Sequence, residues 1–320
     1  MFRFRPYFIL IAVLVACILF TGCGKKQKAG TKGTPENPWI IGMSQCNLGE
    51  PWRVQMNADV ETAAKAHPEL KVLYKDAQNK TPVQQDQVGE FIAQGVDLII
   101  ISPKESRPLT KPVGDAIDAG IPVIVLDRKV EGDKYTCFIG ADNVKIGREA
   151  GKYLVEILGG KGKIVELKGL MTSTPGQERH NGFMEGIKGS KIEIIFDADC
   201  HWLETDAQKE AASALSRFPQ IDAVYGHNDP SAHGAYSAAK QEGKGRKKTI
   251  KFIGIDSLPH EGVRYVKEGI LSATFQYPTG GDEAIDEALK ILKGEKVEKN
   301  ITLGTRIFTK DNVEKGGEPL

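Results

Sequence analysis

Val96-Asp97-Leu98-Ile99-Ile100-Ile101-Ser102 and Ile121-Pro122-Val123-Ile124-Val125-Leu126-Asp127 are two short apolar runs separated by a helical pattern. Their near-continuous Val, Ile and Leu content is typical of strands buried on both faces of a parallel sheet. The same arrangement recurs where residues 221–228 are followed by residues 250–256. In each pair the first strand ends in a polar residue and the second ends in aspartate. This internal repeat predicts two similar halves whose polar strand ends face one cleft.

Ten apolar runs of this kind alternate with helical patterns along the chain. The predicted strands are residues 39–44, 71–75, 97–102, 121–127, 136–140, 163–167, 192–196, 221–226, 250–256 and 271–276. The clearest helical patterns are residues 143–158, 177–188 and 230–241. Alternation of strand and helix indicates right-handed βαβ units. Ten strands are more than a single sheet usually contains, so we expect two sheets. The predicted fold is therefore α/β, with two doubly wound parallel-sheet lobes.

The N-terminus has the pattern of a secretory signal. Arg3 and Arg5 precede an apolar stretch from Tyr7 to Phe20, which is shorter than the roughly 20 residues that span a bilayer. The following Thr-Gly-Cys sequence resembles a bacterial lipobox and would make Cys23 a lipidated first residue. A simple cleaved signal is the alternative. We therefore expect a signal peptide over residues 1–22, a lipidated tether over residues 23–38, and a periplasmic or cell-surface lipoprotein.

Composition and motifs exclude several classes of function. The formal net charge of +1 provides no basic face for nucleic acid. The sequence contains no nucleophile elbow, no dinucleotide fingerprint and no zinc-protease motif, so we expect no catalytic residue, cofactor or metal. A transcription regulator would need a DNA-binding helix pair where the signal stands. Cys46, Cys137 and Cys200 have no metal-like spacing, and buried thiols or one disulfide both remain open.

Candidate site residues follow the predicted strands, since open parallel sheets bind ligands beyond the carboxyl ends of their strands. The polar residues at these ends are Ser102, Asp127, Arg128, Asp142, Asn228 and Asp256. Asp142 directly precedes a helical pattern and could instead cap that helix. Trp52 and Arg53 follow the first strand, and Trp202 has a similar place in the second half. Indole rings can stack on a sugar, and guanidinium groups offer several directed donors.

A series of short motifs extends through most of the chain. They are Ser44-Gln45, Pro51-Trp52-Arg53, Gln94-Gly95-Val96-Asp97, Leu126-Asp127-Arg128, Ala141-Asp142-Asn143, Gln177-Glu178-Arg179, His227-Asn228-Asp229, Gly254-Ile255-Asp256, and Gln276 before Pro278. With these motifs, the stretch from Ile40 to about Arg306 resembles the ribose- and galactofuranose-type members of the type I periplasmic sugar-binding proteins. The number and order of the matches make the resemblance far more specific than any single motif.

The resemblance assigns roles to individual residues. It implies polar sugar contacts from Asp127, Arg128, Arg179, Asn228, Asp256 and Gln276, and ring contacts from Trp52 and Trp202. Arg53 matches the galactofuranose-type proteins, whereas ribose binders usually carry an aromatic residue there. Ser102 stands where the family often has asparagine, and Ala141 where ribose binders have serine. These departures point away from ribose and toward a different or more polar polyol. The predicted ligand is a small sugar, a pentose or hexose, possibly in its furanose form.

The resemblance also implies an architecture and a function. Crossovers near Ala141, Tyr277 and Arg306 would divide the chain into an N-terminal lobe (39–141 plus 277–305) and a C-terminal lobe (142–276 plus 306–320). A monomer of this kind would close at its hinge around a small sugar and deliver it to an ABC permease. Two alternatives stay open, namely a sensory receptor for a chemoreceptor or kinase, and a binder of a nucleoside-like ligand.

Overall fold

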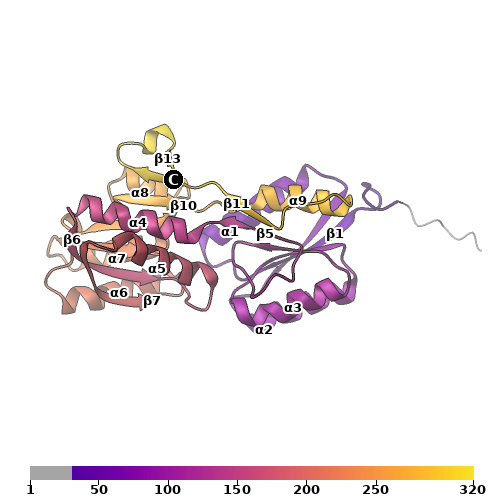
Figure 1. Ribbon diagram of the computed structural model, residues 1–320, viewed down its shortest axis with the longest axis horizontal. Helices are drawn as coiled ribbons and strands as arrows, with labels where there is room; N and C mark the ends of the chain where they lie inside the picture. Colours follow the sequence, from indigo (N-terminus) through magenta and orange to yellow (C-terminus); the bar gives the residue numbers. More distant parts are fainter. Residues whose placement is uncertain (1–30) are drawn as a thin grey trace, which may run out of the picture. The chain divides into compact units, whose positions relative to one another are not determined.

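The computed structural model describes residues 31–320, and they contain nine α-helices and two β-sheets (Figure 1). The predicted signal peptide and the predicted lipidation site, Cys23, lie outside the described residues. None of the helices within 31–320 is both long and apolar enough to cross a membrane. The predicted α/β fold with two parallel-dominated sheets is confirmed.

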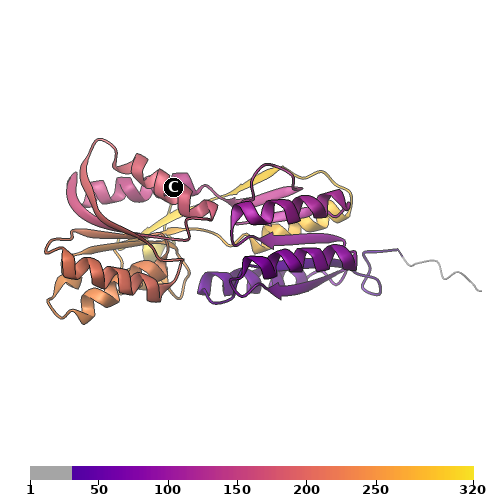
Figure 2. The ribbon, with the colours of Figure 1, turned by 90° about the horizontal axis from the view of Figure 1, so that it is seen from below.

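The first sheet has six strands, all parallel, in the order β11-β5-β4-β3-β1-β2. Its strands are β1 (Trp39–Gln45), β2 (Leu70–Asp76), β3 (Leu98–Ser102), β4 (Val123–Leu126), β5 (Cys137–Ala141) and β11 (Asn300–Leu303). Its helices are α1 (Pro51–Lys65), α2 (Thr81–Gln94), α3 (Ser106–Asp118) and α9 (Gly281–Leu292). Helices α1 and α9 lie on one face of the sheet and α2 and α3 on the other (Figures 1 and 2).

The second sheet has seven strands in the order β13-β12-β10-β9-β8-β6-β7. Five of them are mutually parallel, β6 (Lys161–Lys168), β7 (Lys191–Asp199), β8 (Ala223–Gly226), β9 (Lys251–Asp256) and β10 (Ala273–Gln276). Strands β12 (Arg306–Thr309) and β13 (Glu318–Pro319) extend this sheet in antiparallel fashion. Its helices are α4 (Asn143–Ile157), α5 (Thr174–Ile187), α6 (Glu204–Arg217), α7 (Asp229–Gln241) and the short α8 (Gly262–Lys267). Two 3-10 turns, η1 (Arg246–Lys248) and η2 (Val313–Lys315), complete the elements.

The chain changes sheets three times, between β5 and β6, between β10 and β11, and between β11 and β12. Strands β1 to β10 match the ten predicted strands within a few residues at each end. The prediction missed β11, β12 and β13, because they are only two to four residues long and carry no continuous apolar run. We retain the predicted lobe limits, 39–141 plus 277–305 and 142–276 plus 306–320, as a proposal.

The end of the predicted tether is attached to the first sheet. Lys32 Nζ lies 2.5 Å from Asp97 Oδ1, and the other carboxylate oxygen of Asp97 accepts a hydrogen bond from Ile40 N at 2.8 Å. Gly33, with a φ of 81°, lies so close to the Trp39 ring that a Cβ would come within 2.4 Å of it. An ion pair and an indole contact therefore hold residues 32 and 33 close to the first sheet.

The three cysteines in the described part of the chain are free thiols, and all three are buried. Burial raises the pKa of Cys137 to about 11 and that of Cys200 to about 12. Cys46, Cys137 and Cys200 therefore follow the buried-thiol alternative, and they form no disulfide with one another in this structure.

Helices α4 and α5 pack backbone against backbone through glycines. A Cβ at Gly182 of α5 would lie 2.0 Å from the Val144 carbonyl oxygen, and one at Gly147 of α4 would lie 2.3 Å from the Arg179 carbonyl oxygen. Neither backbone atom can move aside like a flexible side chain. The glycines therefore set the position of α5, and with it the position of Arg179.

We expect Gly182→Ala to destabilise the protein by about 1–3 kcal/mol, the usual range for overpacking. Gly89 of α2 is the matched control, because a Cβ there meets nothing within 4 Å. Gly89→Ala should be neutral or stabilising by up to about 1 kcal/mol, through helix propensity alone. Urea unfolding of both variants measures the difference, and equal stabilities would contradict the proposed role of the glycine contact.

Candidate functional site

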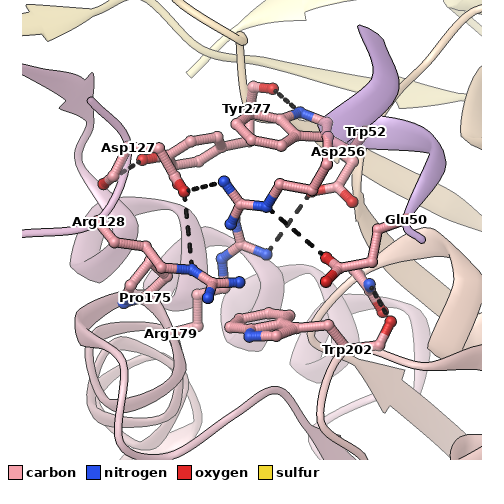
Figure 3. Close-up of a pocket in the computed structure, with 11 residues that line it drawn as sticks. Glu50, Trp52, Asp127, Arg128, Pro175, Arg179, Trp202, Asp256 and Tyr277 are labelled. Carbon is pink, nitrogen blue, oxygen red and sulfur yellow. Dashed lines mark hydrogen bonds and ion pairs between the residues drawn. The ribbon is translucent and has the colours of Figure 1, made fainter. Parts of the chain in front are cut away.

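A polar cavity of about 290 Å³ lies at the carboxyl ends of strands from both sheets (Figure 3). Its walls contain three carboxyl groups, three guanidinium groups and three aromatic rings. The lining residues are Glu50, Trp52, Arg53, Asp127, Arg128, Pro175, Arg179, Trp202, Asn228, Asp256 and Tyr277. A small ligand with many hydroxyl groups and at least one apolar ring face suits such walls.

Arg53 and Asp127 form a buried ion pair at the first sheet. Arg53 stands in the first turn of α1 and Asp127 directly follows β4, and Arg53 Nη1 lies 2.7 Å from Asp127 Oδ2. The same nitrogen donates to Ser102 Oγ at 2.7 Å. Burial alone would lower the pKa of the Arg53 guanidinium, but the charge of Asp127 raises it overall, so the guanidinium stays charged. Each charge therefore depends on the other for compensation.

Arg128 extends this charge group toward the second sheet. Its Nη1 donates to the Lys104 carbonyl oxygen at 3.0 Å, and its Nε lies 3.7 Å from Asp127 Oδ2. The guanidinium carbon lies 5.4 Å from the centre of the Trp202 ring. Because Trp202 follows β7, this cation–π contact joins the two halves of the cavity wall.

Arg179 of α5 is the guanidinium group that the second half contributes. Its Nε donates to Asn143 Oδ1 at 2.9 Å, and its Nη1 donates to the His227 carbonyl oxygen. Asp256, the last residue of β9, lies 3.7 Å from Nη1 through its Oδ1. These partners keep Arg179 buried with its guanidinium group facing the cavity.

The aromatic rings occupy opposite sides of the guanidinium groups, with Trp52 and Tyr277 on one side and Trp202 on the other (Figure 3). Trp52 Nε1 donates to the Tyr277 carbonyl oxygen at 2.9 Å, and the two rings meet edge to face at 5.6 Å. On the far side, the Trp202 carbonyl oxygen accepts from Asn228 Nδ2 at 3.0 Å. A hydrogen bond from the indole N–H therefore holds the Trp52 ring, whereas Trp202 is held through its backbone.

Three donors in the cavity wall are buried and have no hydrogen-bond partner. They are Arg53 Nε, Arg128 Nε and Trp202 Nε1. Leaving a buried donor unpaired costs about 1–3 kcal/mol, and more for a charged group. A ligand that brings several acceptor oxygens would satisfy these donors.

Three residues that line the cavity adopt left-handed backbone conformations without being glycine. Their φ angles are 69° for Asp127, 71° for Trp202 and 119° for Asp256. Such conformations cost on the order of 1–3 kcal/mol each and concentrate at functional sites. Each residue follows or ends a strand, so the strained turn directs its side chain into the cavity.

A second carboxyl group, Asp229, lies buried behind Asp256. Asp229 Oδ1 accepts from Thr274 Oγ1 at 2.6 Å, and Oδ2 accepts from Ser257 N at 2.7 Å. A Cβ at Gly262 would lie 1.9 Å from Oδ2, so only glycine fits there. Burial raises the pKa of Asp229 to about 8. Burial, with a further contribution from Asp229, raises the pKa of Asp256 well above its ordinary value, although Arg179 opposes the shift.

Eight of the eleven predicted site residues line the cavity, namely Trp52, Arg53, Asp127, Arg128, Arg179, Trp202, Asn228 and Asp256. Ser102 does not line it but lies behind it, with Oγ 2.7 Å from Arg53 Nη1 and 3.3 Å from Asp127 Oδ2. The other two residues, Asp142 and Gln276, also lie outside the lining.

Asp142 and Gln276 lie outside the lining for different reasons. Asp142 is exposed, and its Oδ1 accepts from Lys145 N at 2.9 Å, so it caps α4. The alternative helix-cap prediction for Asp142 is therefore the one that the structure bears out. Gln276 ends β10 beside Asp256 but is only half buried, whereas the next residue, Tyr277, reaches the cavity.

Three lining residues, Glu50, Pro175 and Tyr277, were not predicted. Glu50 directly precedes the Pro51-Trp52-Arg53 motif, and Tyr277 lies between Gln276 and Pro278. Their neighbours in these motifs were the signal that could have found them. Pro175, in the first turn of α5, offered no such signal, because that helix begins three residues before its predicted start.

Comparison with known proteins places the chain among periplasmic binding proteins. Residues 41–296 match the family described as the periplasmic binding protein domain. The ribose import binding protein of Bacillus subtilis (strain 168) is 30% identical over 308 residues, which cover 94% of this chain and 98% of that protein. The xylitol-binding protein of Mycolicibacterium smegmatis is 28% identical over 300 residues, which cover 92% and 82% of the two chains.

Solved structures show the same similarity. The fructose-binding periplasmic domain of a hybrid two-component system is 42% identical, with a TM-score of 0.84 over 87% of this chain and 93% of that chain. A galactofuranose-binding protein is 28% identical, with a TM-score of 0.83 over 87% and 97% of the two chains. Both similarities extend over nearly the full length of the solved chains.

The raised pKa of Asp229 makes stability depend on pH. Since the folded chain holds this proton more tightly than the unfolded chain, the associated stability is present below about pH 4 and is lost as the pH rises toward about 8. Asp229→Asn keeps the neutral form at every pH. We expect the variant to gain thermal stability relative to the wild type between about pH 5 and pH 8. The same substitution at exposed Asp118 is the control, and a stability difference for Asp229→Asn that does not change with pH would contradict the shift.

Proposed function

The chain belongs to the type I periplasmic sugar-binding proteins, and we propose that it captures a small sugar outside the cytoplasm and presents it to a membrane partner. The observation that carries this proposal is the buried cavity, with its three guanidinium and three carboxyl groups between two tryptophan rings. Carboxylates accept from sugar hydroxyl groups, guanidinium groups donate to them, and indole rings cover the apolar faces of a sugar ring.

We propose a hexose in its furanose form as the ligand, with fructose as the first candidate. The solved structure with 42% identity is a fructose-binding domain. Others at 28% identity contain fucofuranose or arabinofuranose or are named for galactofuranose.

The proposed contacts follow from the geometry of the walls. Arg53, Asp127, Arg128, Arg179, Asn228, Asp256 and Glu50 would form the polar contacts, and Trp52, Trp202 and Tyr277 the ring contacts. Ser102 would act only through Arg53 and Asp127, which it contacts. We assign no ligand contact to Asp142 or Gln276. Since the family consists of solute-binding proteins, we propose that the sugar is released unchanged.

We propose that the two lobes close around the sugar. Outside the cavity, hydrogen bonds and an ion pair join elements of the first sheet's lobe to elements of the second sheet's lobe. These contacts support a closed form of the protein. Lys129, which follows β4, donates from its backbone N to Thr174 Oγ1 at 3.0 Å and pairs through Nζ with Glu178 Oε1 at 3.1 Å. Ser106 N, at the start of α3, donates to the Thr172 carbonyl oxygen at 3.3 Å. A ligand would favour the closed form to the extent that it binds that form more tightly.

We propose an ABC permease as the membrane partner and a lipid on Cys23 as the anchor. The relative from Bacillus subtilis, which is named an import binding protein, supports the permease. The fructose-binding domain belongs to a hybrid two-component system and supports a sensory partner as the second candidate. Sugar uptake by vesicles that contain the permease tests the first partner. Mass spectrometry of the mature protein, compared with Cys23→Ala, tests the lipid.

Fructose at about 100 times its Kd should stabilise the protein by about 2.7 kcal/mol and raise the unfolding midpoint by roughly 5–10 °C. Arg128→Met should weaken binding by at least about tenfold, because a charged hydrogen bond contributes about 1.5–3 kcal/mol. Arg107→Met, on the exposed face of α3, is the control and should bind like the wild type. No midpoint shift with any furanose, but one with nucleosides, would overturn the ligand class.

Glu178→Ala should weaken the apparent affinity about two- to fivefold, because it removes one partly exposed ion pair of the closed form. Most of this loss should appear as faster sugar release in stopped-flow fluorescence. Glu185 of the same helix pairs with Arg148 of α4, within the same lobe, at 2.8 Å. Glu185→Ala is therefore the matched control, and equal release rates in the two variants would contradict the closure contact.

A further inference from the structure

Glu166 of β6 is a completely buried carboxylate that does not line the cavity. Its Oε1 lies 2.9 Å from His227 Nε2 and 2.9 Å from His180 Nδ1. Lys168, on the same strand, is 4.0 Å away and pairs more closely with Asp197. Glu166 therefore has two imidazole groups as its direct partners, one from α5 and one from the loop after β8.

Each of these histidines is next in sequence to a residue that lines the cavity. His180 follows Arg179, and His227 precedes Asn228. The backbone of His227 is itself part of the arrangement, because its N donates to the Leu167 carbonyl oxygen at 2.9 Å and its carbonyl oxygen accepts from Arg179 Nη1. His227 thus connects the carboxylate of Glu166 to the guanidinium group of Arg179 through a hydrogen bond at each end.

The charge states of Glu166 and His227 determine which hydrogen bonds they can form with each other. Burial would raise the pKa of Glu166, but hydrogen bonds from His180 and His227 lower it to about 2, so the carboxylate is ionised. Burial lowers the pKa of His227, so its imidazole is neutral. A neutral imidazole that donates from Nε2 has no proton on Nδ1, and Nδ1 of His227 is buried without a partner. Glu166 therefore selects one tautomer and one ring orientation.

Ring packing supports the same orientation of His227. The imidazole centre lies 5.0 Å from the Tyr225 ring and 6.4 Å from the Trp202 ring. Trp202 is a cavity residue, and its carbonyl oxygen accepts from Asn228. The His227 ring therefore packs beside a residue of the cavity wall, while its backbone holds Arg179.

We propose that Glu166 is a positioning residue for sugar recognition, which acts through His227 and His180 to hold Arg179 and Asn228 in the cavity wall. This role rests on the proposed function, since it concerns affinity for the sugar. Glu166 itself would not contact the sugar. It would fix the direction of Arg179 and Asn228, which do contact it.

Titration calorimetry with the sugar that saturates the wild type tests the role. Glu166→Gln, which keeps the side-chain shape, should weaken the Kd about five- to twentyfold. His227→Leu, which removes the donor, should weaken it similarly, whereas His227→Gln restores a donor and should stay within about threefold of the wild type. Glu287→Gln is the control, because Glu287 is also buried but lies on α9 and pairs with Lys290.

Imidazole nitrogen NMR of the sugar-free proteins provides a second readout. The wild type should show the Nε2-protonated tautomer of His227, and Glu166→Gln should show a mixture of tautomers. This signature does not depend on the stability of the variants.

The outcomes separate the two proposals. Wild-type protein that binds none of the sugars overturns the proposed function and this role with it. Wild-type protein that binds, while Glu166→Gln and His227→Leu bind equally well, overturns the positioning role alone. His227→Gln with as large a loss as His227→Leu also overturns it, because the effect would then come from packing and not from the hydrogen bond.

Discussion

The buried ion pair between Arg53 and Asp127 is the interaction on which the rest of the site depends. The two side chains are 3% and 4% exposed, and their closest atoms are 2.7 Å apart. Removing one partner of such a pair typically costs about 3–5 kcal/mol, because the other charge is left buried and uncompensated. The pair therefore fixes the first turn of α1 against the end of β4. Ser102 accepts from the same Arg53 nitrogen, and Arg128 lies beside the same Asp127 oxygen. Asp127 takes part in these contacts from a left-handed backbone conformation.

The second half of the chain also contributes an arginine and an aspartate, but their charged groups lie farther apart. Arg179 and Asp256 are 3.7 Å apart. The guanidinium group donates to the His227 carbonyl oxygen, whereas burial, together with the Asp229 carboxyl, raises the pKa of Asp256. A sugar that enters the cavity meets unpaired donors in both halves, Arg53 Nε and Arg128 Nε in the first and Trp202 Nε1 in the second. Sugar oxygens that accept from both halves at once would link recognition to the proposed closure of the two lobes.

The fold and most of the candidate site could be predicted from the sequence, because parallel sheets bind ligands at the carboxyl ends of their strands. Asp127, Asn228 and Asp256 could be found because each follows or ends an apolar run. The side-chain direction at a turn could not be found in this way, which is why Asp142 caps a helix and Tyr277, rather than Gln276, reaches the cavity. Glu166 was invisible for a third reason. A glutamate within a strand reads as a solvent-facing residue, and only the structure shows the two histidines that keep it charged and buried.

Tryptophan emission tests most directly whether the sugar lies between the Trp52 and Trp202 rings. The chain has three tryptophans, of which Trp52 and Trp202 line the cavity and Trp39 packs against Gly33 at the start of the first sheet. In a Trp39→Phe variant, all indole emission comes from the cavity. We expect a saturable change in emission on addition of fructose, with the same Kd as calorimetry. Calorimetric binding without any change in emission would show that the sugar does not lie between these two rings.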